Sequence, residues 1–198
     1  MAQVDGPVDV LEHRTTFGAR RLWRRVAMAV VGVVIVSFAA AFVDRRLRSG
    51  EFDQILAGCQ AAETDSAYAE RKVTAMLDYA TPLLQRPDAT ADQKSGMAAL
   101  VRATASTAAD SLAPGRSTLV TVTILPWHRL QLAARDACQN YLAEAEHRLR
   151  RVADDLSALD VPTGYLRVQQ RAARAALMSA AVDPAASRAA GGMFVGTP

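Results

Sequence analysis

Two cysteines, Cys59 and Cys138, carry the clearest chemistry in this chain. Each falls on the apolar face of an expected helix. In an up-down-up path the first and third helices run parallel, so the two cysteines would lie at similar positions along the bundle axis. In an oxidising compartment such a pair is expected to form a disulfide, which would contribute roughly 4 kcal/mol through loop closure. Two free buried thiols, as expected in the cytoplasm, and a bond between two chains are the alternatives.

The histidines His13, His128 and His147 give weaker signals. Glu144 and His147 match the helical Glu-x-x-His pattern of dinuclear carboxylate sites, but the neighbouring apolar residues place both on the outer helix face, and there is no second copy. His128 follows Trp127 at an expected helix start, where an imidazole can act as a base, yet no Ser or Cys nucleophile motif accompanies it. We interpret Trp127 as a plug at the end of a bundle or an anchor at a membrane surface.

The remaining polar clusters indicate no reaction. Asp136 and the pair Asp154–Asp155 are typical of solvated helix charges, and no helix that would complete a phosphate-binding loop is expected after Gly191–Gly192. The sequence therefore predicts no catalytic residue, no metal site and no cofactor, and we expect a protein that is not an enzyme.

Residues 26–43 form an uncharged run of 18 residues in which Ser37 is the only polar side chain. A helix of this length spans roughly 27 Å, close to the thickness of the hydrocarbon core of a bilayer. It satisfies its own backbone polar groups in lipid. Trp23 and Phe42 lie at its ends, and Trp is the better interfacial anchor. The run predicts a transmembrane helix, so the lipid bilayer is an expected partner.

Arginines flank this run on both sides and predict its orientation. The flanking positions are Arg20, Arg21, Arg24 and Arg25 before it, and Arg45, Arg46 and Arg48 after it. With Arg14 the count is five against three, and Lys and Arg favour the cytoplasmic side. We expect an uncleaved signal-anchor in the plasma membrane, with the tail 1–25 cytoplasmic and the later chain outside. A signal peptide cleaved near Ala41 and a buried core helix are the alternatives.

Beyond the run, apolar residues recur at helical spacing in four segments separated by breakers. These segments cover residues 47–86, 90–112, 126–159 and 163–182. No Pro separates the first segment from the apolar run, so one helix can be continuous through both, and Pro82 is expected to kink or end it. Thr90 and Gln93 predict a capping box. The expected fold is all-α, with an antiparallel bundle of about four helices over residues 44–182.

The apolar faces of these segments predict the core of the bundle. The first face is interrupted only by the polar Ser66. The first face comprises Phe52, Ile55, Cys59, Ala62, Ala69, Val73, Met76, Ala80 and Leu83. The second comprises Met97, Leu100, Val101, Ala108 and Leu112. The third comprises Ala134, Cys138, Leu142, Ala145, Leu149, Val152, Leu156 and Leu159, and the fourth comprises Tyr165, Val168, Ala172, Ala175 and Val182.

Two segments do not follow a helical pattern. In residues 117–125, Val120, Val122 and Ile124 alternate with threonines, which is typical of a strand. A single strand makes no sheet, so we expect an extended connection or a short helical distortion. Residues 183–198 are rich in Pro, Ala, Ser and Gly and are expected to form a disordered tail.

The charge distribution narrows the function classes. Residues 44–198 carry 18 basic and 17 acidic residues, without the clustered basic face that nucleic acid requires. We expect an interaction or scaffold component of the cell envelope that binds a protein partner or itself, for example as a coiled coil. The alternative is a ligand-binding or sensory module that signals through the span to a cytoplasmic partner.

Overall fold

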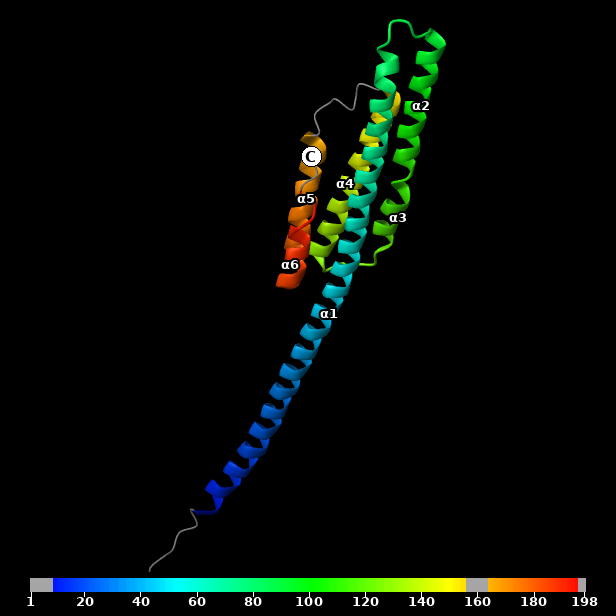
Figure 1. The fold of residues 1–198 in the computed structure, drawn as a ribbon. Helices are drawn as coiled ribbons and strands as arrows, with labels where there is room; N and C mark the ends of the chain where they lie inside the picture. Colours follow the sequence, from blue (N-terminus) through cyan, green and yellow to red (C-terminus); the bar gives the residue numbers. More distant parts are fainter. Residues whose placement is uncertain (1–8, 156–163, 196–198) are drawn as a thin grey trace, which may run out of the picture. The chain divides into compact units, whose positions relative to one another are not determined.

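The computed structural model describes residues 9–155 and 164–195, with side chains from residue 22 onward. Within these residues every regular element is a helix, so the expected all-α class is confirmed (Figure 1). The chain divides into two compact units, residues 1–46 and 47–198, which are described separately below. The helices are α1 (Asp9–Leu84), α2 (Ala91–Asp110), α3 (Ala113–Thr121), α4 (Arg129–Asp154), α5 (Gly164–Ala180) and α6 (Pro184–Gly191).

Helix α1 contains the apolar run and the first predicted segment of the second unit without a break in helical backbone. Pro82 lies inside its last turn, and the helix ends two residues later, as a proline that removes a backbone donor would favour. In the first unit, the Ser37 hydroxyl donates to the carbonyl oxygen of Val33 at 2.8 Å. The one polar side chain of the run is therefore satisfied within its own helix.

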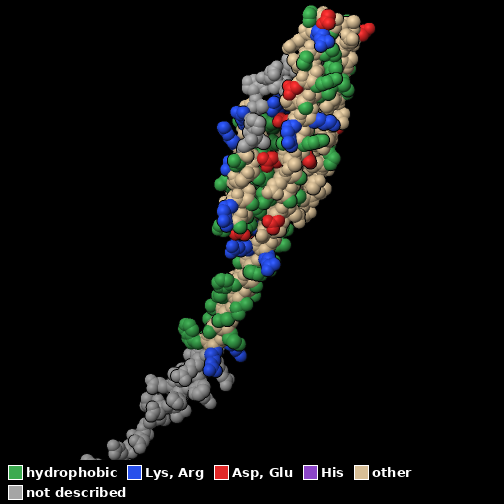
Figure 2. All heavy atoms as spheres, viewed as in Figure 1, with side chains coloured by type: hydrophobic (Ala, Val, Ile, Leu, Met, Phe, Trp, Pro, Cys, Tyr) green, Lys and Arg blue, Asp and Glu red, His purple; other side chains and the backbone are tan. Residues whose placement is uncertain are grey.

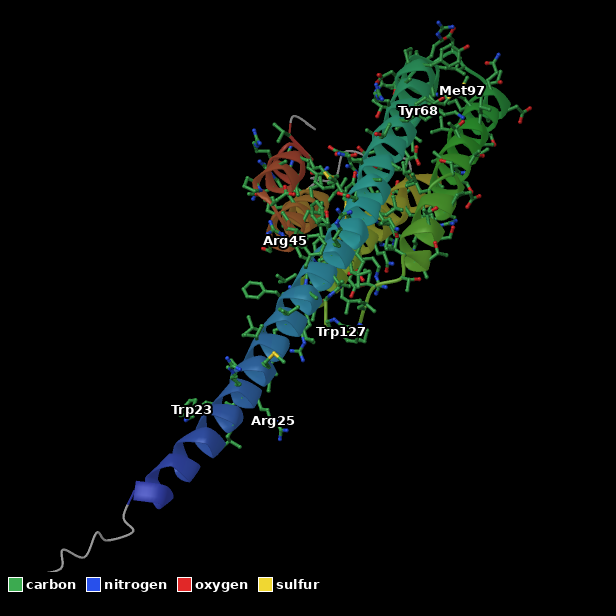
Figure 3. The ribbon with its side chains drawn as sticks, turned by 90° about the horizontal axis from the view of Figure 1, so that it is seen from below. Trp23, Arg25, Arg45, Tyr68, Met97 and Trp127 are labelled. Carbon is green, nitrogen blue, oxygen red and sulfur yellow. A yellow bond between two sulfur atoms is a disulfide. The ribbon has the colours of Figure 1, made fainter. Side chains whose placement is uncertain are left out.

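The second unit has one hydrophobic core to which all six helices contribute. Helix α4 is its central element, because it packs against α2, α3 and α5, while α6 packs against α5. Helix α2 runs beside the later part of α1 in both ribbon views (Figures 1 and 3). The predicted faces of α1 and α4 are confirmed from Phe52 to Val73 and from Ala134 to Val152. Leu156 and Leu159 lie outside the described residues.

The capping box that begins α2 is confirmed. The Gln93 backbone N–H donates to the Thr90 hydroxyl at 3.3 Å, and the Thr90 N–H donates to Gln93 Oε1 at 3.0 Å. Two donors that the first turn leaves without helical partners are thus satisfied. This feature depends only on residues three positions apart, which is why the sequence predicts it.

The strand-like pattern of residues 117–125 is not realised as an extended segment over its first half. Helix α3 includes residues up to Thr121, with Pro114 in its first turn. The Ser117 and Thr118 hydroxyls both donate to the Pro114 carbonyl oxygen, and Leu119 is fully buried. Burial of one leucine and local bonds from hydroxyls therefore outweigh the weak helix propensity of Thr and Val.

The predicted buried face of α5 is wrong. Tyr165 and Val168 are exposed, and so are Ala172 and Ala175, while Val182 lies beyond the helix and is partly buried. The buried residues are Leu166, Ala173, Leu177 and Ala180. Both sets follow a helical period, and in an alanine-rich helix only the packing against α4 selects the face that carries the leucines.

The predicted disordered tail is replaced by helix α6 over its described part, residues 183–195. Asp183 caps this helix, since its Oδ1 accepts from the N–H groups of Ala185 and Ala186 at 2.9 and 2.8 Å. Ala190 and Met193 are buried. An N-cap followed by Pro at the first helical position is a start signal, which the small-residue composition obscures.

Candidate membrane segment and buried cross-links

The apolar run presents its side chains to the outside on every face. Among the described residues, one helix contains a window long and apolar enough to cross a membrane, with a mean hydropathy of 2.7 and none of the window buried. Val30, Val31, Val33, Val34 and Ile35 are all exposed, and consecutive positions on a helix point in all directions. Figure 2 shows hydrophobic side chains gathered along the visible face of this run, a band with basic side chains near its ends.

The ends of the band carry the residues that the sequence predicts as membrane-flanking. Trp23 is 72% exposed, and Arg24 and Arg25 beside it are exposed as well; Trp23 and Arg25 project from the helix in Figure 3. At the other end the Arg46 guanidinium lies 5.6 Å from the centre of the Phe42 ring, and Arg45 is exposed. Arg48 belongs to the second unit, and the side chains of Arg20 and Arg21 lie outside the described residues.

Cys59 and Cys138 are brought to disulfide distance. Their Cα atoms are 5.6 Å apart, and both side chains are fully buried between α1 and α4. The bond joins residues 79 positions apart, so it closes a loop that contains α2 and α3. In the loop-entropy account such a closure contributes about 4 kcal/mol.

A second cross-link joins Glu51 of α1 to the turn that precedes α4. Nδ1 of His128 lies 2.5 Å from Oε2 of Glu51, and the Leu125 backbone N–H donates to Oε1 of Glu51 at 2.9 Å. A carboxylate only accepts hydrogen bonds, so Nδ1 of His128 is the donor. The His128 N–H also donates to the Leu125 carbonyl oxygen at 2.9 Å. One carboxylate therefore fixes both ends of the Leu125–His128 turn.

The arrangement of this pair favours a structural role over a catalytic one. A histidine oriented by a carboxylate is a component of many active sites, but the His128 side chain has no exposed surface and so offers no face to a substrate in solution. Trp127, which we interpreted as the plug of the bundle end, is exposed, whereas His128 is buried. Sequence reasoning missed Glu51. The signal was its position four residues before Ile55, in phase with the buried face of α1.

A third cross-link holds the chain after α6 against α1 and α4. The Ser66 and Tyr141 hydroxyls are hydrogen-bonded to each other, and the Phe194 ring packs edge-on against the Tyr141 ring with centroids 4.8 Å apart. The Phe194 N–H donates to Oε1 of Glu63 at 2.8 Å. Burial raises the pKa of Tyr141 above its usual value near 10, although the bond to Ser66 opposes this. The polar intruder in the predicted face of α1 is therefore the partner of a buried tyrosine.

The remaining predicted patterns stay apart from these cross-links. His147 is exposed, and Glu144 accepts from Arg151 at 3.2 Å. Asp136 accepts from its neighbour Arg135. Gly192 donates to carbonyl oxygens at the end of α6. Across the described parts of the chain, no three His, Cys, Asp or Glu side chains gather as a metal site would require.

Charged pairs connect the helices at the surface of the second unit. Arg148 of α4 donates to Glu70 of α1 at 3.1 Å, and Arg150 donates to Asp110 of α2 at 2.9 Å. The Arg148–Glu70 pair is partly buried, whereas the Arg150–Asp110 pair is exposed, and exposed pairs contribute little to stability. Figure 2 shows basic and acidic side chains interspersed over the visible face, in keeping with the near-neutral charge of residues 44–198.

In comparisons with known proteins, no protein-family model, no curated protein and no solved structure matches the chain.

Proposed function

We propose that this chain is a single-span membrane protein whose second unit is a non-catalytic interaction module held outside the cytoplasm. In this proposal the second unit is an antiparallel bundle anchored in the plasma membrane, a component of the cell envelope that binds a protein partner or a second copy of itself. The observation that carries the proposal is the apolar run of α1, exposed on all faces.

Exposure on every face distinguishes a bilayer from a protein partner as the surrounding of this run. A partner helix or surface covers one face of a helix, whereas lipid surrounds it. Each large aliphatic side chain left in water forgoes about 1.5–3 kcal/mol of transfer free energy. The second unit buries most of its large aliphatic residues in one core. The many exposed valines of residues 26–43 therefore favour lipid, rather than water, as the surrounding of this run.

Two observations support placing the second unit outside the cytoplasm. The basic residues number five before the run and three after it, which favours a cytoplasmic start. The two cysteines stand at disulfide distance, and disulfides persist in oxidising compartments.

Exposed aromatic side chains on the second unit offer contact points for a partner, because interfaces are enriched in tyrosine. These side chains are Tyr68, Tyr79 and Tyr165.

Thiol labelling in intact cells tests both the anchor and its orientation. Ser95 is exposed on α2, so Ser95→Cys adds one accessible thiol while Cys59 and Cys138 remain paired. A membrane-impermeant maleimide is expected to label Ser95→Cys in intact cells and to leave the unsubstituted chain unlabelled. The matched control, Thr16→Cys on the other side of the run, is expected to react only after the membrane is opened.

The unsubstituted chain is also expected to resist carbonate extraction from membranes and to move faster on non-reducing gels than on reducing gels. Extraction into the soluble fraction would contradict the anchor. Labelling of Thr16→Cys in intact cells, with Ser95→Cys protected, would reverse the orientation. Alkylation of Cys59 and Cys138 without reductant would contradict the disulfide.

A further inference from the structure

The Leu125–His128 turn exposes the most prominent apolar side chains at the start of α4. Trp127 is 62% exposed and Leu130, three residues further on, is 53% exposed, with the exposed Arg129 between them in the sequence. Figure 3 shows Trp127 at the end of the second unit where α4 begins. Trp with a basic neighbour is the composition that proteins place at the level of lipid headgroups.

The indole is held in place by buried groups. The ring centroids of Trp127 and His128 are 6.0 Å apart in an edge-on arrangement, and His128 is fixed to Glu51 as described above. Because the bond between His128 and Glu51 fixes the turn, the position of Trp127 is pre-organised. Binding of its ring to a surface then costs little conformational entropy.

The chain itself limits how far this turn stands from the bilayer. Glu51, to which the turn is bound, comes eight positions after Val43, the last residue of the apolar run. A helix rises about 1.5 Å per residue, so Glu51 stands no more than about 12 Å along the chain from the end of the run at any tilt. The headgroup layer itself extends roughly 5–7 Å beyond the hydrocarbon core.

We propose that the Leu125–His128 turn is a second membrane contact, in which Trp127 and Leu130 enter the headgroup region and Arg129 meets lipid phosphate. The contact rests on the membrane anchor proposed above and deepens it, because it adds a fixed attachment between the second unit and the lipid surface. The Glu51–His128 bond then positions Trp127 for lipid rather than serving a reaction.

The chain has two tryptophans, Trp23 and Trp127, which makes fluorescence a direct test. The full chain is reconstituted in vesicles of phosphatidylcholine and phosphatidylglycerol whose acyl chains carry bromine near the headgroup or near the chain end. In Trp23→Phe the emission comes from Trp127 alone. We expect it to shift to shorter wavelength and to lose intensity, more with the shallow bromines than with the deep ones. Aqueous acrylamide should quench it weakly.

Three further variants separate this inference from the anchor, from unspecific adsorption and from a turn that is not held by Glu51. Trp127→Phe leaves Trp23, whose quenching by bromolipid reports insertion of the span. Tyr79→Trp, in a chain without the other two tryptophans, places an indole at a 70% exposed site on α1 far along the sequence from the run. Its emission is expected to respond to acrylamide and not to bromolipid. Glu51→Ala, which releases the turn, is expected to lower the quenching of Trp127 by lipid.

The outcomes are distinct. Trp127 quenched by acrylamide but not by lipid, while Trp23 is quenched by lipid, would overturn the contact and leave the anchor standing. Shielding of Trp127 from both quenchers would indicate a protein cover, by a partner or a second copy, and would also overturn it. Equal quenching of Tyr79→Trp by lipid would reveal unspecific adsorption. If lipid quenches neither native tryptophan, the anchor fails and the inference falls with it.

Discussion

At the scale of single residues, Glu51 joins the start of the second unit to the turn that precedes α4. Its two oxygens accept from Leu125 and His128, and little of it is exposed. A buried carboxylate is costly unless its oxygens are satisfied. Removal of His128 would therefore leave Oε2 of Glu51 without this donor, while the bond from the Leu125 N–H to Oε1 can remain.

We expect His128→Ala to lower the free energy of unfolding by about 3 kcal/mol, because it leaves one oxygen of a buried carboxylate without its donor and opens a cavity at a buried ring. Glu51→Gln should cost less, about 1–2 kcal/mol, since its amide oxygen still accepts one of the two bonds. Urea unfolding of the full chain in a mild detergent, followed by circular dichroism, measures both. Asp53→Ala, an exposed acidic position two residues on, is the control and should stay within about 0.5 kcal/mol. Equal losses for Asp53→Ala and His128→Ala would contradict the role of the pair.

At the scale of helices, the close approach of α1 and α3 depends on the absence of a side chain at Gly58. A Cβ atom built there would lie 2.7 Å from Cδ2 of Leu119, which is fully buried in α3. Leu119 thus packs directly onto the backbone of α1. This contact explains why the Thr- and Val-rich segment becomes helical: as a helix it turns Leu119 into that space.

Two glycine substitutions with the same helix propensity should therefore change stability in opposite directions. Gly96→Ala in α2, where the added Cβ meets nothing, should stabilise the chain by about 0.5–1 kcal/mol. Gly58→Ala gains the same propensity but overpacks Leu119, which costs about 1–3 kcal/mol, so a net loss of about 1 kcal/mol is expected. The same urea titration measures both. In a double-mutant cycle, Leu119→Ala should relieve the penalty of Gly58→Ala; additive effects would argue against the contact.

At the scale of the whole molecule, contacts between distant parts of the sequence hold the core of the second unit together. Cys59 and Cys138 join α1 to α4, and the chain after α6 returns to both helices through Phe194. Phe194 has a positive φ of 56°, an uncommon conformation for a residue with a side chain. The packing on Tyr141 and the bond to Glu63 compensate for it.

Phe194→Ala should destabilise the second unit by about 2 kcal/mol, because it removes a partly buried ring from Tyr141 while keeping the Cβ atom and hence the backbone strain. The neighbouring Val195→Ala changes an exposed side chain and should have almost no effect. Hydrogen exchange of the α4 amides measures both variants. Equal effects of the two substitutions would contradict the contribution of the Phe194 ring to the packing on Tyr141.

The features that the sequence determined by itself are those that depend on near neighbours along the chain. The apolar run needs only its own uninterrupted hydropathy, the capping box needs two residues three positions apart, and the buried faces of α1 and α4 repeat over many turns. Local periodicity and capping are sufficient for such features, since each repeats or closes within a few residues of the chain. The same two faces led us to expect that the cysteines could meet, but their disulfide distance depends on the packing of α1 against α4.

The tertiary structure alone decided the face of α5, the burial of Leu119 in α3, the packing of residues 190–194 and the pairing of Glu51 with His128. In α5 two faces of the helix carry apolar residues, and only the packing against α4 selects the face with Leu166 and Leu177. Glu51 and His128 are 77 positions apart, so no local pattern relates them. The physical reason is the same in each case: the free energy that favours these arrangements comes from burial and hydrogen bonds between elements, which exist only once the helices have packed.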